Sequence, residues 1–158
     1  MSTVKLTQRG YEKLHAELRE LIDVRRPQVM VDLVQAREYG DISENAEYET
    51  AKRDQGMTEG RIHELEAILS TVEIIELPKK VTEAVIGAKI KVENIDGGKQ
   101  KEYVLVCEQE AHLEDIYLSV ESPLGKSLLG KKSGEIVEFM APAGLRKFKV
   151  IQISVYSG

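Results

Sequence analysis

Apolar residues recur at helical spacing through the first half of the chain. An early stripe has intervals of three and four residues and comprises Tyr11, Leu14, Leu18 and Leu21. This spacing is typical of a helix that packs along a partner helix. Thr7 precedes the stripe and is predicted to cap the helix N-terminus.

The same helix is predicted to continue beyond a proline. Pro27 has no backbone N–H to donate, so we expect a bend there. Beyond it a shifted stripe comprises Met30, Leu33, Val34 and Arg37. Gly40 is predicted to end the helix.

A second helix is predicted after a short connection. Its stripe keeps intervals of three and four and comprises Tyr48, Ala51, Gln55, Thr58, Ile62, Leu65, Leu69 and Val72. Two helices of about 30 residues joined by so short a turn must lie antiparallel, as a coiled-coil hairpin roughly 45 Å long.

The second half alternates apolar and polar residues at strand spacing. Strands are predicted around Ile90, within 103–107, at 136–140 and at 145–155, with turns at 96–98 and 142–144. Ser122 and Pro123 are predicted to open a short helix that Gly130 ends. The fold class is therefore α+β, with a helical hairpin (1–76), a linker (77–81) and a small antiparallel β-sheet domain with one helix (82–158).

Composition narrows the class of protein. Hydrophobic residues make up 42% and charged residues 31% of 158 residues, which indicates a soluble folded chain without a membrane span. A single cysteine, Cys107, argues against a disulfide framework, so we expect a cytoplasmic protein. The formal net charge of -5 disfavours an independent nucleic-acid binder.

The chain carries no recognisable catalytic motif of its own. The three histidines lie far apart in sequence, and glycine-rich phosphate-binding motifs are absent. We therefore expect no bound cofactor, no metal site of its own and no independent enzymatic activity.

Two acidic residues stand where the predicted hairpin turns. Asp41 and Glu44 have the spacing of a capping box, in which they would cap the second helix and favour its dipole. Spacing alone favours this structural role. The alternative follows from their place at the end of a long hairpin, from which two carboxylates can be delivered into another protein's active site.

The sequence resembles a known family at this segment and elsewhere. The tip R-E-Y-G-D-I-S-E-N-A-E-Y, T-x-x-G-Y-E-K-L near the start and S-P-L-G-K-S-L-L-G-K-K near the end are similar to bacterial transcript cleavage factors of the GreA/GreB family. The resemblance covers nearly the whole chain. It implies a coiled coil that enters the secondary channel of RNA polymerase and a C-terminal domain of the FK506-binding-protein type that docks at the channel rim.

The resemblance also implies roles for individual residues. Asp41 and Glu44 would hold the second Mg²⁺ of the polymerase active site and stimulate endonucleolytic cleavage of the nascent RNA 3′ end in backtracked complexes, so that elongation resumes. The factor is expected to act as a monomer. Contacts to RNA or the channel are expected from Arg37, Lys52 and Arg53, and polymerase docking from Ser122 and Pro123.

A purely structural role remains an alternative at each of these positions. The three basic residues are equally typical of a solvated helix face, and Ser122 with Pro123 is typical of a helix start. A different function also stays open, in which the chain occupies the same channel and inhibits or regulates polymerase without promoting cleavage. The presence of both tip carboxylates favours cleavage.

Overall fold

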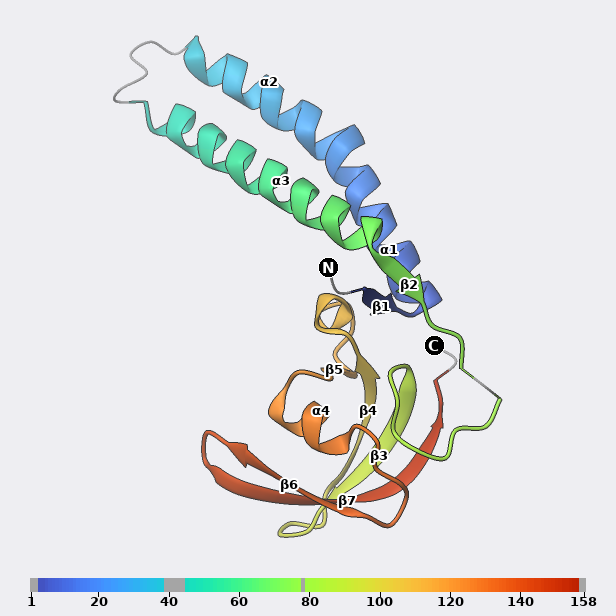
Figure 1. The fold of residues 1–158 in the computed structure, drawn as a ribbon. Coiled ribbons are helices and arrows are strands. Elements are labelled where there is room, and N and C mark those ends of the chain that lie inside the picture. Colours follow the sequence, from blue (N-terminus) through green and yellow to red (C-terminus); the bar gives the residue numbers. More distant parts are fainter. Residues whose placement is uncertain (1–2, 39–44, 78, 157–158) are drawn as a thin grey trace. The chain divides into compact units, whose positions relative to one another are not determined.

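The computed structural model describes residues 3–38, 45–77 and 79–156 (Figure 1). It divides into a hairpin unit, Glu12–Thr71, and a C-terminal unit, Met1–Tyr11 with Val72–Gly158. This division differs from the predicted boundary after Glu76. The first residues join the C-terminal unit because β1 (Val4–Leu6) pairs in parallel with β2 (Val72–Ile74), and because Thr7 hydrogen-bonds Glu110.

The hairpin unit is built from one interrupted helix and one continuous helix, which Figure 1 shows side by side. The interrupted helix consists of α1 (Gln8–Glu20), the π-helical turn η1 (Leu21–Arg25) and α2 (Arg26–Arg37), and the continuous helix is α3 (Ala46–Ser70). Thr7 caps α1 as predicted, since its hydroxyl oxygen accepts from the Gly10 N–H at 3.0 Å. The α+β class with an N-terminal helical hairpin is confirmed.

The π-helical turn changes which residues face the partner helix. The Arg26 N–H donates to the carbonyl of Leu21, five residues back, immediately before Pro27. A proline ring clashes with the carbonyl four residues earlier in a regular α-helix, and the wider turn avoids this clash. Without an extra residue, the apolar stripe that reaches Leu21 would continue at positions 25, 28, 32 and 35. The extra residue moves it to positions 26, 29, 33 and 36, of which Val29, Leu33 and Ala36 are buried.

The stripe predicted after Pro27, which comprised Met30, Leu33, Val34 and Arg37, was mostly wrong. The buried residues of α2 are Val29, Leu33 and Ala36, whereas Met30 and Val34 are 45% and 51% exposed. On α3 the predicted seam is largely confirmed, with Ile68 buried in place of Leu69.

The C-terminal unit contains a five-stranded sheet of order β5-β4-β3-β7-β6. Its elements are β3 (Ala88–Asn94), β4 (Gln100–Val106), β5 (Tyr117–Ser119), β6 (Ile136–Ala141) and β7 (Gly144–Val155), with the 3₁₀ turn η3 (Glu108–Glu110) and helix α4 (Pro123–Leu128). The predicted antiparallel sheet needs one correction. β5 pairs in parallel with β4, because the chain returns through η3 between them rather than through a tight hairpin.

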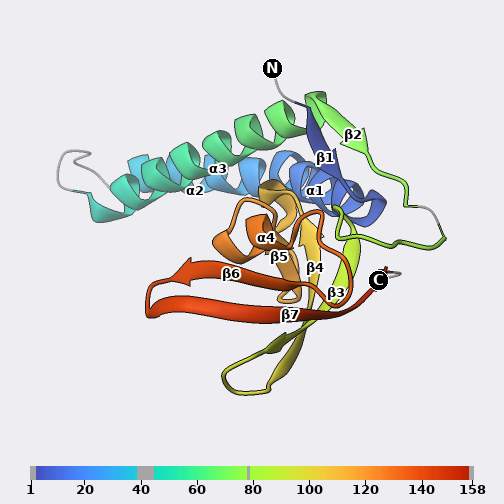
Figure 2. The same cartoon turned by 60° about the horizontal axis from the view of Figure 1, so that its bottom comes forward.

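Helix α4 lies over one face of this sheet (Figure 2). Its Leu124 and Leu128 pack with Ile90, Leu105 and Val150 in the main core. Val104 and Val106 point to the opposite face of β4, where they pack against Tyr117. Burial of β4 on both faces agrees with its prediction as a central strand. No helix in the described part of the chain is long and apolar enough to cross a bilayer.

Candidate functional site

Asp41 and Glu44, the carboxylates predicted to act at the tip, lie outside the described residues. The two helix ends that carry this segment are described: α2 ends at Arg37, and α3 begins at Ala46. The last turn of α2 and the first turn of α3, with Asn45 before it, are called the stem of the tip.

Asn45 is the N-cap of α3. Its backbone is extended (φ -89°, ψ 102°), and its side-chain oxygen accepts from the backbone N–H groups of Glu47 at 3.0 Å and Tyr48 at 3.1 Å. The N-cap of the described helix is therefore Asn45, and the capping box expected from the D-x-x-E spacing at Asp41 and Glu44 lies outside the described residues. Asn45 was not predicted as a cap, although asparagine ranks among the best capping residues.

Two further contacts join the helix ends. The Asn45 side-chain nitrogen, Nδ2, donates to the carbonyl oxygen of Ala36 at 2.5 Å. The guanidinium of Arg37 lies over the Tyr48 ring, 5.9 Å from its centroid. Arg37, which was predicted to contact RNA or the channel, therefore has an intramolecular partner across the stem.

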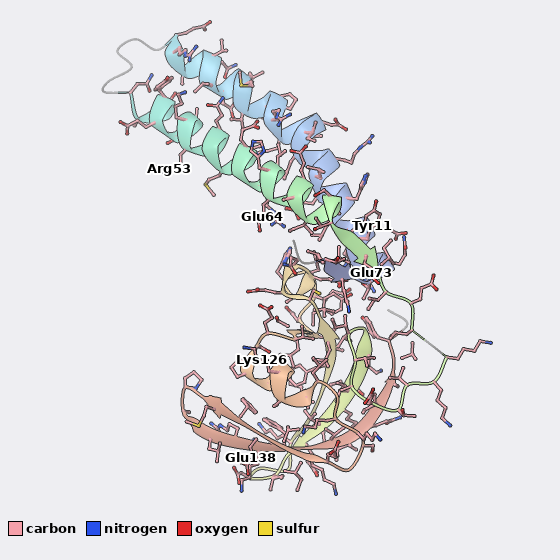
Figure 3. The ribbon with its side chains drawn as sticks, viewed as in Figure 1. Tyr11, Arg53, Glu64, Glu73, Lys126 and Glu138 are labelled. Atoms are coloured by element: carbon pink, nitrogen blue, oxygen red, sulfur yellow. The ribbon has the colours of Figure 1, made fainter. Side chains whose placement is uncertain are left out.

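The other two basic residues lie on the exposed surface of α3. Lys52 and Arg53 follow Asn45 by seven and eight residues, which places them about 11 Å along the helix axis from the cap. Figure 3 labels Arg53 on this helix. Both side chains are exposed, and neither forms an ion pair with another described residue.

An open groove runs between α2 and α3 next to the stem. It has a volume of about 370 Å³, and its lining includes the carboxylates Asp32, Glu47 and Asp54. Asp32 accepts a hydrogen bond from Gln28 at 3.0 Å, and Asp54 lies 3.6 Å from Arg25. No cluster of three or more metal-binding side chains occurs among the described residues.

Two arginine–carboxylate pairs tie the helices together below the groove. Arg26 donates to Glu59 through Nε at 2.7 Å and Nη2 at 2.8 Å, and Arg61 donates to Glu17 at 2.6 and 3.0 Å. The hydrogen bonds donated by Arg26 lower the pKa of the Glu59 carboxyl, and those that Arg61 donates to Glu17 raise the pKa of Arg61. Such two-bond pairs have a defined geometry and so fix the axial register of the hairpin.

The predicted docking residues lie at the start of α4. The Ser122 hydroxyl oxygen accepts from the Gly125 N–H at 3.1 Å, and the hydroxyl donates to the Ser119 carbonyl at 2.6 Å. Ser122 therefore caps the helix as predicted, while Pro123 at its first position is exposed.

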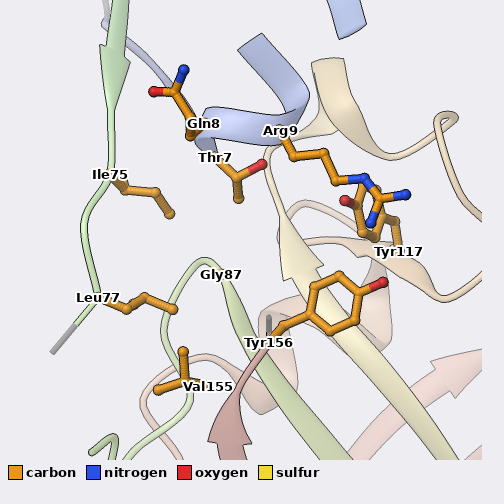
Figure 4. Close-up of a pocket in the computed structure, with 9 residues that line it drawn as sticks. All are labelled: Thr7, Gln8, Arg9, Ile75, Leu77, Gly87, Tyr117, Val155 and Tyr156. Carbon is orange, nitrogen blue, oxygen red and sulfur yellow. The ribbon is translucent and has the colours of Figure 1, made fainter. Parts of the chain in front are cut away.

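A second cavity, of about 320 Å³, lies in the C-terminal unit (Figure 4). Its apolar wall comprises Ile75, Leu77 and Val155, and its polar wall includes Arg9 and Tyr156. Arg9 pairs with Glu114 at 2.5 Å, and the Tyr156 hydroxyl donates to Glu114 at 3.2 Å. These polar groups are engaged with one another, so the cavity indicates no particular ligand.

Family models match both parts of the chain. One, described as "Transcription elongation factor, N-terminal", matches residues 4–74, and another, "Transcription elongation factor, GreA/GreB, C-term", matches residues 78–155. The chain belongs to the GreA/GreB family of transcription elongation factors. The family resemblance noted in the sequence is thereby confirmed.

Curated members of the GreA/GreB family match over their full length. Transcription elongation factor GreA of Thermotoga neapolitana is 44% identical over 98% of this chain and 99% of its own. GreA of Verminephrobacter eiseniae is 40% identical over 98% and 99%. Among solved structures, GreA factor homolog 1 of Thermus thermophilus is 31% identical, with a TM-score of 0.45 and coverage of 96% of this chain and 99% of that one.

Proposed function

We propose that this GreA/GreB family member binds bacterial RNA polymerase, inserts its hairpin tip into the secondary channel and stimulates cleavage of the nascent RNA 3′ end in backtracked complexes. The new 3′ end then lies in the active site again, and elongation resumes. The cleavage belongs to the polymerase, and the factor is not an enzyme by itself. Asp41 and Glu44 are the residues that assist it.

The observation that supports this role is the cap of α3. Asn45 satisfies the N–H groups of Glu47 and Tyr48, so the helix start does not require a carboxylate from Asp41. The first turn of α3 therefore has a cap from within the described residues. Two carboxylates in the segment that joins the two helices of a hairpin suit delivery into a partner's active site.

The donor set fits a magnesium ion that is shared with the partner. Mg²⁺ is usually held by one or two protein carboxylates, while waters and phosphate oxygens complete its octahedron. Asp41 and Glu44 would supply the carboxylates, and polymerase and RNA would supply the remaining ligands. The second ion of a two-metal centre stabilises charge on the reacting oxygens. No ion bound to the isolated factor is required.

Docking and RNA contacts complete the proposal. Lys52 and Arg53 are exposed on α3 and would contact phosphates of the extruded RNA. Pro123 is exposed at the start of α4 and would contact the channel rim, with Ser122 holding the helix start in shape. Pro123→Arg is expected to weaken polymerase binding without changing the thermal stability of the factor.

The test uses a walked, backtracked elongation complex with RNA labelled at its 3′ end. Release of short RNA is followed at neutral pH and millimolar Mg²⁺, with and without the factor. Wild type is expected to accelerate release, and Asp41→Asn or Glu44→Gln is expected to reduce the acceleration by about 10²-fold or more. Competition with wild type should show that both variants still bind polymerase.

Glu47→Gln is the matched control. Glu47 is an exposed carboxylate in the first turn of α3, three residues from Glu44, and it should be replaceable without loss of cleavage. An equal loss of stimulated cleavage in all three variants would show that only the total negative charge of this region matters, and not the positions of Asp41 and Glu44. Polymerase binding with inhibition and no cleavage by wild type would instead establish the alternative function, a channel-binding regulator.

A further inference from the structure

Asn45 does more than cap α3. Its side-chain oxygen accepts from the N–H groups of Glu47 and Tyr48, while its side-chain nitrogen donates to the carbonyl oxygen of Ala36 in α2. Ala36 is 3% exposed and belongs to the seam between the helices. One short side chain thus ties the last turn of α2 to the first turn of α3, across nine residues of sequence.

This pair of tasks requires an amide side chain. Asparagine carries an acceptor and a two-hydrogen donor on the same short stem, whereas ionised aspartate only accepts. Aspartate or serine at this position would retain the capping oxygen. Aspartate would also face the Ala36 carbonyl with another acceptor, and serine would not carry an amide to reach it.

A second contact acts in the same two helix turns. Arg37 in the last turn of α2 lies over the ring of Tyr48 in the first turn of α3. The ends of the segment between Arg37 and Asn45 are therefore held together at two points. Restricting the ends of a short segment reduces the volume that its residues can explore.

We propose that Asn45 is a positioning residue for the tip carboxylates. By bonding Ala36, it holds together the two helix ends from which the segment with Asp41 and Glu44 extends into the polymerase active site. This inference rests on the proposed function and deepens it. Because misplacing a reacting group by about 1 Å can cost 10²-fold in rate, the amide should affect the cleavage step rather than binding.

The experiment compares Asn45→Asp, Asn45→Ser and Asn45→Ala with wild type, each titrated against backtracked complexes. The cleavage rate at saturating factor and the half-saturating concentration are measured separately, and thermal unfolding is followed by circular dichroism. We expect all three variants to lower the saturated rate at least tenfold, with a half-saturating concentration within about twofold of wild type. Aspartate and serine, which keep the capping oxygen, should lower the thermal midpoint less than alanine does.

Each other outcome overturns a distinct claim. Aspartate and serine variants that cleave like wild type would leave Asn45 as a helix cap alone. Loss of cleavage with aspartate but not with serine would assign the effect to added charge. A rise in half-saturating concentration at an unchanged saturated rate would make Asn45 a binding residue. Wild type that fails to stimulate cleavage overturns the proposed function itself and the positioning role with it.

Discussion

The carboxylate of Glu110 accepts a hydrogen bond from the hydroxyl of Thr7, although 103 residues separate them in sequence. Glu110 is completely buried, and the Thr7 N–H also points to its carboxylate. A buried charge is tolerated only when it is paired or hydrogen-bonded. The first turn of α1 supplies such donors, so this helix start is part of the C-terminal unit's interior.

Gly10 should not tolerate alanine. A Cβ at this position would occupy the space of the Glu110 carboxylate. Overpacking of this kind costs about 1–3 kcal/mol, so Gly10→Ala should lower the free energy of unfolding measured by urea denaturation. Gly60→Ala is the matched control, because a Cβ there meets nothing within 4 Å and a helix gains about 1 kcal/mol from this change. Equal effects of the two variants would contradict the contact.

Neighbouring residues of α2 should differ sharply in their contribution to stability. Leu33 is 4% exposed and Val34 is 51% exposed. Leu33→Ala is expected to destabilise the hairpin by about 2–5 kcal/mol, and Val34→Ala by about 0.5 kcal/mol or less. Denaturation followed by circular dichroism measures both. A larger loss of unfolding free energy for Val34→Ala than for Leu33→Ala would show that Val34 faces α3, as the sequence pattern predicted.

The Arg26–Glu59 pair should make hairpin stability depend on pH. The pKa of Glu59 is lowered chiefly by hydrogen bonds from Arg26, so the unfolded chain takes up this proton before the folded chain does. The stabilisation is therefore present above the ordinary glutamate pKa and is lost as pH falls through the lowered one. Thermal unfolding of wild type and Arg26→Met should differ at pH 7 and converge as pH falls to 3.

Arg19→Met is the control for this measurement. Arg19 lies 3.8 Å from Asp23 on the same helix, and both side chains are largely exposed, so this contact should contribute little. A difference between wild type and Arg26→Met that stays constant down to pH 3 would show that Arg26 stabilises the hairpin by packing alone.

Cys107 should react slowly with alkylating reagents in the folded protein. Burial is the main cause that raises the pKa of its thiol, and the reactive species is the thiolate. At pH 8 the folded chain should therefore be alkylated by iodoacetamide more slowly than the chain in urea. Equal rates would show that the thiol is exposed and ordinary.

Features that depend on neighbours in sequence were predicted well. The caps at Thr7 and Ser122, the hairpin turn beside Gly98 and the central strand around Leu105 follow from local residue types and spacing. The seam of α2 was not predictable in this way, because one extra residue in a π-helical turn shifts everything after it. The spacing of apolar residues does not reveal such a turn, because a stripe through Met30 and Val34 is as apolar as the buried one through Val29 and Leu33.

The candidate site illustrates the same limit. The D-x-x-E spacing at Asp41 suggested a cap because a capping box is a short-range pattern. The role of Asn45 depends in addition on its hydrogen bond to Ala36 in the other helix. That contact depends on how two helices pair. The parallel pairing of β5 with β4 was missed for a related reason, since strand direction depends on the path of the connecting chain.

The π-helical turn at Leu21–Arg25 also sets the direction in which the far end of the hairpin faces. One residue of an α-helix corresponds to about 100° of rotation about its axis. Removing one residue from this turn would make the distal half of the first helix present a different side to α3, or rotate the pair that follows. The side of α2 that faces α3 near Arg37 is therefore determined about ten residues earlier in the sequence, by the number of residues in the turn.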